Sequence, residues 1–286
     1  MNNAFQIDEV ASAALGLLSR QTVLGATVYR DAEAEFIGGR GSVVGVRLPK
    51  QRTAKDYTGT TEFVDVEEGI AHVKLTDEPT DAAKLGTRDM TLDIRNFGAQ
   101  VLMPQLDSVA RYIEKNLAAL MNAQADSADA VIIDPANPLK AIAAAAAEFV
   151  RREVEPGDRF LAVGPDVYGA LLDVEQLQRV DASGDDSMLE RAEIGTLFGF
   201  RVIVSPYLTG AIAYHRTAFA LANRAPYVNE GAGKSSSQTF NGYAIRATID
   251  YSADVKSDVS IVDSLCGSVI LDATRMIPFN LKKSQK

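Results

Sequence analysis

The chain has 286 residues, of which 47% are hydrophobic and 23% charged, so it is long and apolar enough for one large or two medium packed domains. Its net charge of -9 excludes a protein that wraps nucleic acid by neutralising phosphates, because that mode of binding needs clustered Lys and Arg. The longest apolar stretch, near residues 141–147, is too short to span a bilayer, and residues 1–20 lack the basic start of a secretory signal, so we expect no membrane partner.

The first third of the chain, residues 1–78, contains too little apolar surface to close a core of its own. Within it, residues 42–49 (SVVGVRLP) are typical of a β-branched strand that ends at a proline. Strand-like runs at Phe63–Val66 and Ile70–Leu75 predict a hairpin over residues 53–78 that turns at residues 67–69. A lone hairpin is marginal in water, so we expect this one to pack on another subunit or domain.

A long helix is predicted next, over residues 104–123. Its apolar residues recur at spacings of four and three: Leu102, Leu106, Val109, Ile113, Leu117 and Leu120. Its polar residues fall away from that stripe: Arg111, Glu114, Lys115 and Asn116. The preceding residues, 92–102, read either as a strand or as a bent extension of the helix.

A second helix is predicted to begin at Pro138, with Asn137 as its N-cap, and to stop before residues 156–157. We expect its buried stripe to hold Leu139, Ile142, Ala146, Phe149 and Val150. Short elements then follow in chain order: a strand at 160–163, a helix at 167–177, strands at 198–204, 211–214 and 218–222, a loop at 226–242, and strands at 243–251 and 259–271. This order predicts an α+β fold with segregated elements rather than a regular βαβ alternation.

The order of parts resembles the major capsid proteins of tailed bacteriophages, which have the Hong Kong 97 phage-type fold. The resemblance rests on SVVGVRLP at 42–49, IGTLFGFRVIVSPYL at 194–208, AIAYHRTAFALA at 211–222 and GYAIRATIDYS at 242–252. It implies an N-terminal arm (1–48), an extended loop (49–78), a peripheral domain with a spine helix (79–154), an axial domain (155–245) and a return to the peripheral domain (246–286).

The resemblance also implies a function and partners. It implies a structural protein of the virion, made in the host cytoplasm, that self-assembles into an icosahedral shell of hexamers and pentamers around double-stranded DNA. The DNA would be enclosed without specific binding, since an acidic wall does not trap it. Scaffolding, portal and possibly decoration proteins would be separate chains. A nanocompartment shell of the encapsulin type is the nearest alternative, because it shares the fold.

The extended loop carries charges of both signs that could meet their opposites on a neighbouring copy and so fix register and partner. The candidate contact residues are Lys50, Arg52, Lys55, Asp65, Glu67 and Glu68. A merely soluble hairpin is the alternative reading of the same charges.

An enzyme with an active site on the loops at 181–187 and 226–242 is the alternative from another class, but no nucleophile, base and orienting group converge in the sequence. Gly233-Lys234-Ser235 ends like a phosphate-binding loop, yet Val228 stands where that motif needs glycine. His72, His215 and the lone Cys266 read as structural residues. Acid pairs at 126–129 and 185–186 lack regular ligand spacing, so we expect no catalytic site, cofactor or metal.

Overall fold

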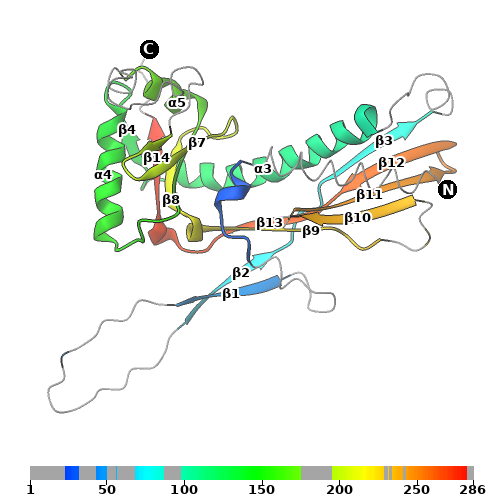
Figure 1. Cartoon of the computed structure of the whole chain (residues 1–286), viewed down its shortest axis with the longest axis horizontal. Helices are drawn as coiled ribbons and strands as arrows, with labels where there is room; N and C mark the ends of the chain where they lie inside the picture. Colours follow the sequence, from blue (N-terminus) through cyan, green and yellow to red (C-terminus); the bar gives the residue numbers. More distant parts are fainter. Residues whose placement is uncertain are drawn as a thin grey trace.

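The computed structural model of the chain describes residues 23–31, 43–49, 56, 68–86, 98–174, 195–228, 231, 234–240 and 243–281. Figure 1 shows a compact part on the left, built on a six-stranded sheet, and an elongated part on the right, built on a four-stranded sheet. One long helix runs along the elongated part. A two-stranded hairpin leaves the body between the two parts.

The long helix is α3, Met103–Ala125, and it confirms the predicted spine. A π-helical turn, η3 (Gly98–Leu102), leads directly into it, so the described part of the preceding segment is a helical extension and not a strand. Pro104 lies in the first turn of α3, where its missing N–H costs nothing.

The buried side of α3 matches the predicted stripe. Leu106, Val109, Ile113 and Leu117 are each at most 2% exposed, whereas Arg111 and Lys115 face solvent. Glu114 was expected away from the stripe, but it is only 3% exposed. That expectation is wrong because residues 23–31 cross the helix on this side, and the backbone N–H of Leu24 donates to Glu114 Oε1 at 2.8 Å.

Replacing Ile113 with alanine should therefore destabilise the folded subunit by about 2–5 kcal/mol, because the side chain is fully buried and its removal leaves a cavity. Lys115→Ala, two positions along on the exposed face, should change stability by less than about 0.5 kcal/mol. Denaturant midpoints of the two purified variants measure the difference. A neutral Ile113→Ala with a severe Lys115→Ala would contradict this orientation of α3.

The six-stranded sheet has the order β4-β14-β8-β5-β7-β6. Its strands are β4 (Val131–Ile133), β5 (Arg159–Val163), β6 (Thr196–Leu197), β7 (Phe200–Val204), β8 (Ala211–His215) and β14 (Met276–Leu281). Helices α4 (Pro138–Arg151) and α5 (Pro165–Leu172) complete this part, and Phe149 of α4 meets Phe200 edge to face at 5.1 Å between ring centroids. Two expectations are corrected: Val150 is 67% exposed, and α5 ends five residues before the predicted end.

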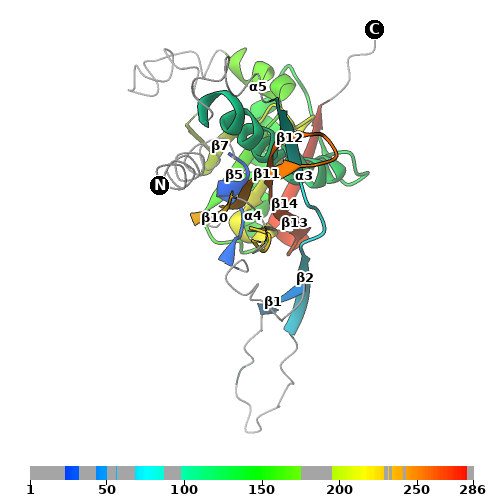
Figure 2. The same cartoon turned by 90° about the vertical axis from the view of Figure 1, so that its right-hand side faces the viewer.

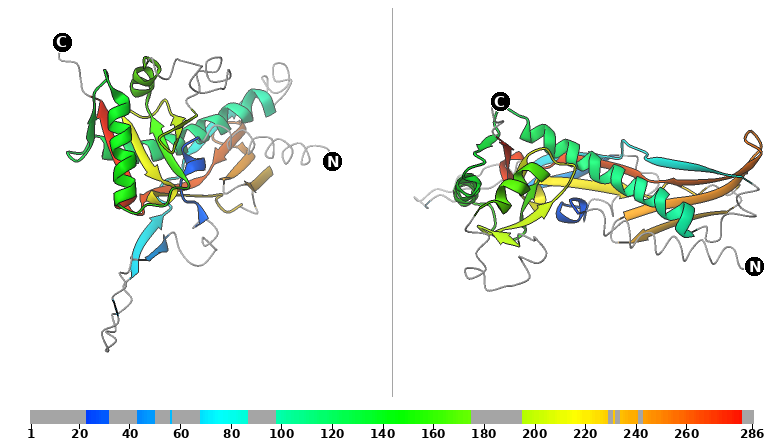
Figure 3. Two further views of the ribbon diagram at one scale, coloured as in Figure 1. Left: turned by 60° about the vertical axis from the view of Figure 1, so that its left-hand side comes forward. Right: turned by 90° about the horizontal axis from the view of Figure 1, so that it is seen from above.

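The four-stranded sheet has the order β10-β11-β12-β3, and α3 lies along it (Figure 3). Its strands are β3 (Thr80–Leu85), β10 (Lys234–Phe240), β11 (Tyr243–Ser252) and β12 (Ser257–Asp263). The predicted loop at 226–242 therefore contains a strand. Serine-rich β10 carries no apolar alternation, and it is held by backbone pairing to β11 and by a 2.8 Å bond between Ser235 Oγ and Thr248 Oγ1.

Two connecting strands, β9 (Phe219–Arg224) and β13 (Leu265–Ile270), pair with each other and link the two larger sheets. Short 3-10 turns carry the chain into and out of the compact part: η5 (Arg216–Ala218) after β8 and η6 (Ala273–Arg275) before β14. The N–H groups of Leu271 and Asp272 both donate to the Ala218 carbonyl, so the two crossings lie side by side.

The hairpin consists of β1 (Val43–Pro49) and β2 (Glu68–Lys74), and Figure 2 shows these strands pointing away from the body. β1 confirms the predicted strand that ends at proline. The predicted turn at residues 67–69 is wrong, because Glu68 pairs with Pro49 and Gly69 pairs with Leu48. The expected strand at Phe63–Val66 lies outside the described residues.

The base of the hairpin is fastened to β13. The N–H of Asp77 donates to the Cys266 carbonyl at 3.0 Å, and the N–H of Cys266 donates to the Asp77 carbonyl at 2.9 Å. Gly267 lies against the backbone of Lys74, where a Cβ atom would overlap the carbonyl oxygen. Val44 and Val73 of the hairpin pack on Ala220, Ala222 and Leu271. The hairpin thus has a rigid root.

Candidate intersubunit surface

The exposed side of α3 and the neighbouring strand β3 form a seam with two hollows. The larger hollow, about 590 Å³, is lined by Glu78, Pro79, Thr80, Ser108, Val109, Arg111, Tyr112 and Lys115. The smaller one, about 350 Å³, lies further along the same seam and is lined by Asp81, Ala83, Lys84, Leu85, Gln100, Val101, Pro104 and Gln105. We call this surface the α3–β3 seam.

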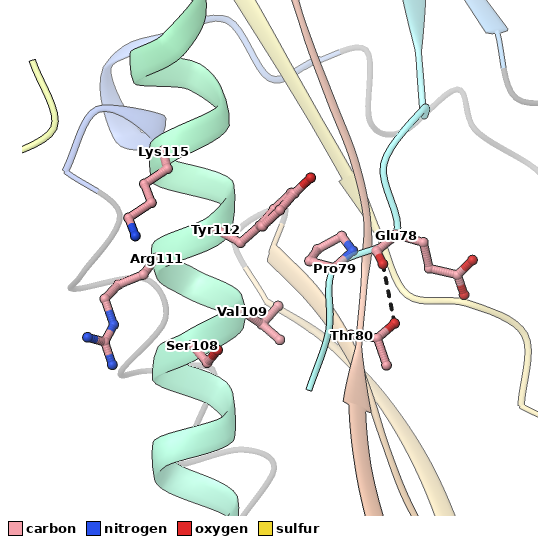
Figure 4. A pocket seen from close by; sticks show the side chains of 8 residues that line it. All are labelled: Glu78, Pro79, Thr80, Ser108, Val109, Arg111, Tyr112 and Lys115. Atoms are coloured by element: carbon pink, nitrogen blue, oxygen red, sulfur yellow. Dashed lines mark hydrogen bonds between the residues drawn. The ribbon is translucent and has the colours of Figure 1, made fainter. Parts of the chain in front are cut away.

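Figure 4 shows how the larger hollow is built. Tyr112 and Val109 point from α3 toward the segment at Glu78–Thr80, whereas Arg111 and Lys115 point to the other side of the helix. Tyr112 is 45% exposed, so its ring is available to a partner. The negative charge of Asp77 raises the pKa of Tyr112 above its ordinary value, which is already well above neutral pH. The hollow thus has an aromatic ring facing an acidic segment, with two cations on the adjoining side of the helix.

The seam is held rigid by Gln105. Its Nε2 donates to the backbone carbonyls of Asp81 at 3.1 Å and Ser260 at 3.0 Å, and its Oε1 accepts from Ser260 Oγ at 2.7 Å. These bonds tie α3 to β3 and β12 through a side chain that is 4% exposed. A partner would therefore meet a preformed surface, which lowers the entropy cost of binding.

β3 is also the edge strand of its sheet. Edge strands present backbone N–H and C=O groups that another extended segment can pair with. A partner on the seam could thus combine side-chain contacts in the hollows with backbone contacts along β3.

The structure describes only part of the predicted contact set. Of the predicted contact residues, Glu68 alone belongs to the described backbone, at the start of β2. The other five lie outside the described residues: Lys50, Arg52, Lys55, Asp65 and Glu67. The hairpin root that carries them shows two exposed apolar side chains, Val43 at 41% and Ile70 at 57%.

The cysteine, the histidines and the Lys-Ser pair that were weighed as catalytic candidates lie in strands or in the core. Burial raises the pKa of the Cys266 thiol to about 12, so it is not a thiolate at neutral pH. His215 is 5% exposed and bonds to Thr217, and burial lowers its pKa. His72 lies on the exposed side of β2, and Lys234 and Ser235 belong to β10, not to the solvent loop expected from the sequence.

Two further observations concern only the described part of the chain. No group of three or more His, Cys, Asp or Glu residues there is arranged to hold a metal ion. No helix there is long and apolar enough to cross a membrane. The loop at 181–187 lies outside the described residues.

The comparisons with known proteins decide the family. A family model described as phage capsid protein matches residues 87–263, which is more than half of the chain. The match includes α3 and three of the four runs that carry the resemblance, and it begins just after β3. The chain belongs to the phage capsid protein family. A search of curated proteins found no match.

Solved structures place this capsid protein in the expected fold. A chain from Mycobacterium phage Che8 has a TM-score of 0.66 at 18% identity, covering 91% of both chains. The mature capsid of bacteriophage PhiM1 gives 0.61 at 14% identity, covering 86% of this chain and 84% of that one. A virus-like particle from Pyrococcus furiosus gives 0.51 at 13% identity, covering 94% and 97%.

The fold is the Hong Kong 97 phage-type capsid fold, as expected from the sequence. The protein is a structural component of a phage capsid. The sequence could not reveal the α3–β3 seam, because periodicity identifies each element but not how α3 packs beside β3. The one available signal was Tyr112, an aromatic residue placed off the apolar stripe of the helix.

Proposed function

We propose that this capsid protein forms the closed icosahedral head of a tailed bacteriophage, as hexamers and pentamers around double-stranded DNA. The observation that carries the proposal is the phage capsid family match on a chain with the Hong Kong 97 phage-type fold and a projecting hairpin. The net charge of -9 supports a wall that encloses DNA without binding it specifically. The role is structural, not catalytic.

We further propose the domain division that the family resemblance implies. Residues 1–48 form the arm, 49–78 the extended loop, 79–154 the peripheral domain, 155–245 the axial domain and 246–286 the return. Two observations support this division. Strand β3 and the spine helix α3, both within residues 79–154, pack together along the four-stranded sheet, and β5, β7 and β8 of the six-stranded sheet all lie within residues 155–245.

The extended loop is proposed to lie on the α3–β3 seam of the next subunit. Its root is rigid, points away from its own body and leaves Val43 and Ile70 exposed. The seam offers the matching features of a docking site: a preformed hollow, the half-exposed ring of Tyr112 and the edge of β3, the outermost strand of its sheet among the described residues. One such contact repeated around a rotation axis generates a closed ring.

Charge supports the same arrangement. Arg111 and Lys115 make the outer side of α3 positive beside the seam, which suits the acids of the loop, Asp65, Glu67 and Glu68, although Arg111 also pairs with Asp107 of the same helix. The bases of the loop, Lys50, Arg52 and Lys55, need acids on the neighbouring copy, and Glu78 lines the same hollow. Complementary charges of this kind fix register and partner more than they add affinity.

Other partners follow from the assembly role. Scaffolding, portal and any decoration proteins would be separate chains. The capsid protein itself would be synthesised in the host cytoplasm. We propose no membrane contact.

The proposal is tested by expressing the full chain, with and without candidate scaffolding proteins, and examining it by size-exclusion chromatography and negative-stain electron microscopy. Closed shells of uniform diameter are the expected result. A compact, stable monomer under every assembly condition would contradict the proposal. Shells that package protein and exclude DNA would favour the nanocompartment alternative.

A further inference from the structure

Residues 23–31 form a strap that crosses α3 and reaches the connecting strand β9. Leu24 and Val28 are fully buried in the core beneath α3. The N–H of Tyr29 donates to the Phe219 carbonyl, and the N–H of Leu221 donates to the Tyr29 carbonyl, both at 3.0 Å. Figure 1 and the right panel of Figure 3 show the short turn η1 (Gly25–Thr27) of this strap beside α3.

The strap packs tightly against the strands on its other side. A Cβ atom on Gly25 would overlap the Tyr243 hydroxyl oxygen. The hydroxyl groups of Thr27 and Tyr214 lie 2.5 Å apart. The strap thus makes close polar contacts on the side of the sheets, and on the side of α3 it adds a hydrogen bond to Glu114 to the apolar packing of Leu24 and Val28.

Glu114 fastens the strap to α3 through one oxygen only. Its Oε1 accepts the Leu24 N–H at 2.8 Å, while its buried Oε2 has no hydrogen-bond partner. The Glu114 side chain belongs to a residue that is 3% exposed. Burying an ionised carboxylate that is not fully paired or hydrogen-bonded costs far more than burying the neutral acid, so this geometry favours the neutral acid.

Among the described residues, the cations nearest to Glu114 are engaged elsewhere. Glu114 and Ser205, whose buried Oγ also lacks a partner, line a hollow of about 260 Å³ that opens beside Val23. Arg111 lines the same hollow, but its guanidinium is paired with Asp107 on the same helix. Lys115 lies over the ring of Tyr207, 5.4 Å from its centroid.

The other titratable groups near the contact between Glu114 and the strap are Tyr214, Arg30 and Asp31. From β8, Tyr214 bonds to Thr27, and burial raises its pKa beyond the physiological range. On the strap itself, Arg30 lies 3.6 Å from the ring centroid of Tyr243. Asp31, the last described residue of the strap, is exposed.

We propose that Glu114 is a proton-operated latch, whose neutral carboxyl keeps the strap closed on α3 and whose ionised carboxylate loosens it. The inference goes beyond the shell function, and it concerns the single subunit. Because the strap lies between residues 1–22 and the hairpin strand β1, the latch would couple pH to the position of the N-terminal arm.

The direction of the pH dependence follows from the titration of this carboxyl. Burial raises the pKa of Glu114 from 4.5 to about 7, against a smaller opposing effect of the N–H groups of Leu24, Gly25 and Val23. A raised acid pKa means that the closed strap holds the proton more tightly than the open strap does. The stabilisation of the closed strap is therefore complete below pH 4.5, decreases as pH rises, and is lost above about pH 7.

The test is hydrogen exchange of the Leu24 amide in the purified, unassembled full chain. With these two pKa values, the closing equilibrium should fall about tenfold between pH 6 and pH 8, after correction for the intrinsic exchange rate. Glu114→Gln should remove this dependence, because the amide cannot ionise. Glu148→Gln on the exposed side of α4 is the matched control and should retain it. A constant protection factor in the unmodified chain, or an unchanged dependence in Glu114→Gln, would overturn the latch.

A second measurement does not depend on the variant folding. The unmodified chain can be labelled with carboxyl ¹³C-glutamate, and the Glu114 resonance followed with pH. A midpoint near pH 7 that coincides with the loss of Leu24 protection supports the latch. A midpoint near the usual value of 4.5, or one that leaves Leu24 protection unchanged, contradicts it. Since neither measurement requires a shell, failure of the latch is distinguishable from failure of the assembly proposal.

Discussion

Gly267→Ala is expected to detach the root of the hairpin and to destabilise the subunit severely. Gly267 lies in β13 against the end of β2, where an added Cβ would overlap the backbone oxygen of Lys74. Backbone cannot rotate aside as a side chain can, so β2 must move away from β13. The neighbouring hydrogen bonds between Asp77 and Cys266 would then be lost.

The expected cost is at the upper end of the about 1–3 kcal/mol that overpacking usually brings, because the obstruction is main chain. Urea unfolding measures the loss of stability. Limited proteolysis within residues 68–78 reports whether the root of the hairpin has moved. Gly169→Ala is the control: nothing lies within 4 Å of its Cβ in the short helix α5, where alanine is the better helix former. Equal midpoints for Gly267→Ala and the unmodified chain would contradict the close packing of β2 on β13.

Local periodicity was enough to predict α3, but not the burial of Glu114. A stripe at spacings of four and three identifies one face of a helix without any knowledge of its surroundings. Position 114 flanks that stripe, and its polarity placed it outside. Its burial depends on Leu24, which lies 90 residues earlier in the chain. Sequence alone does not report such a contact.

The strand that pairs with β2 was predicted wrongly for a similar reason. The sequence favoured pairing between the nearest strand-like runs, at Phe63–Val66 and Ile70–Leu75. The structure instead pairs β2 with β1, which begins 25 residues earlier. The β-branched run at 42–49 was recognised as a strand, so the error concerned register and connection length, which depend on tertiary contacts at the hairpin root.

Of the two surfaces in the proposed intersubunit contact, only the extended loop could be predicted from the sequence. Charges in the extended loop can be named from the sequence because they lie in one short segment. The facing seam combines Glu78 with Arg111 and Tyr112, which the chain brings together only through the packing of α3 beside β3. Likewise, β10 carries no apolar alternation, and only its pairing with β11 makes it a strand.

Reversing the loop bases together, as Lys50→Glu, Arg52→Glu and Lys55→Glu, is expected to block or misdirect assembly while the subunit stays folded. In the proposed arrangement these bases face acids of a neighbouring copy, and Glu78 of the seam is one of them. Bringing like charges together across an interface costs on the order of several kcal/mol. Assembly yield by size-exclusion chromatography, set against the far-ultraviolet circular dichroism of the subunit, measures the effect.

A charge-conserving triple variant, Lys50→Arg, Arg52→Lys and Lys55→Arg, separates charge from shape. It keeps all three positive charges while changing every side chain, so it should assemble with normal yield if complementarity of sign decides the contact. The reversed variant should also become less defective as salt rises, since screening weakens repulsion between exposed charges. Normal shells from the reversed variant would show that these bases do not face acids. Equal failure of both triple variants would assign the contact to side-chain shape, because only the reversed variant changes the sign of the charge.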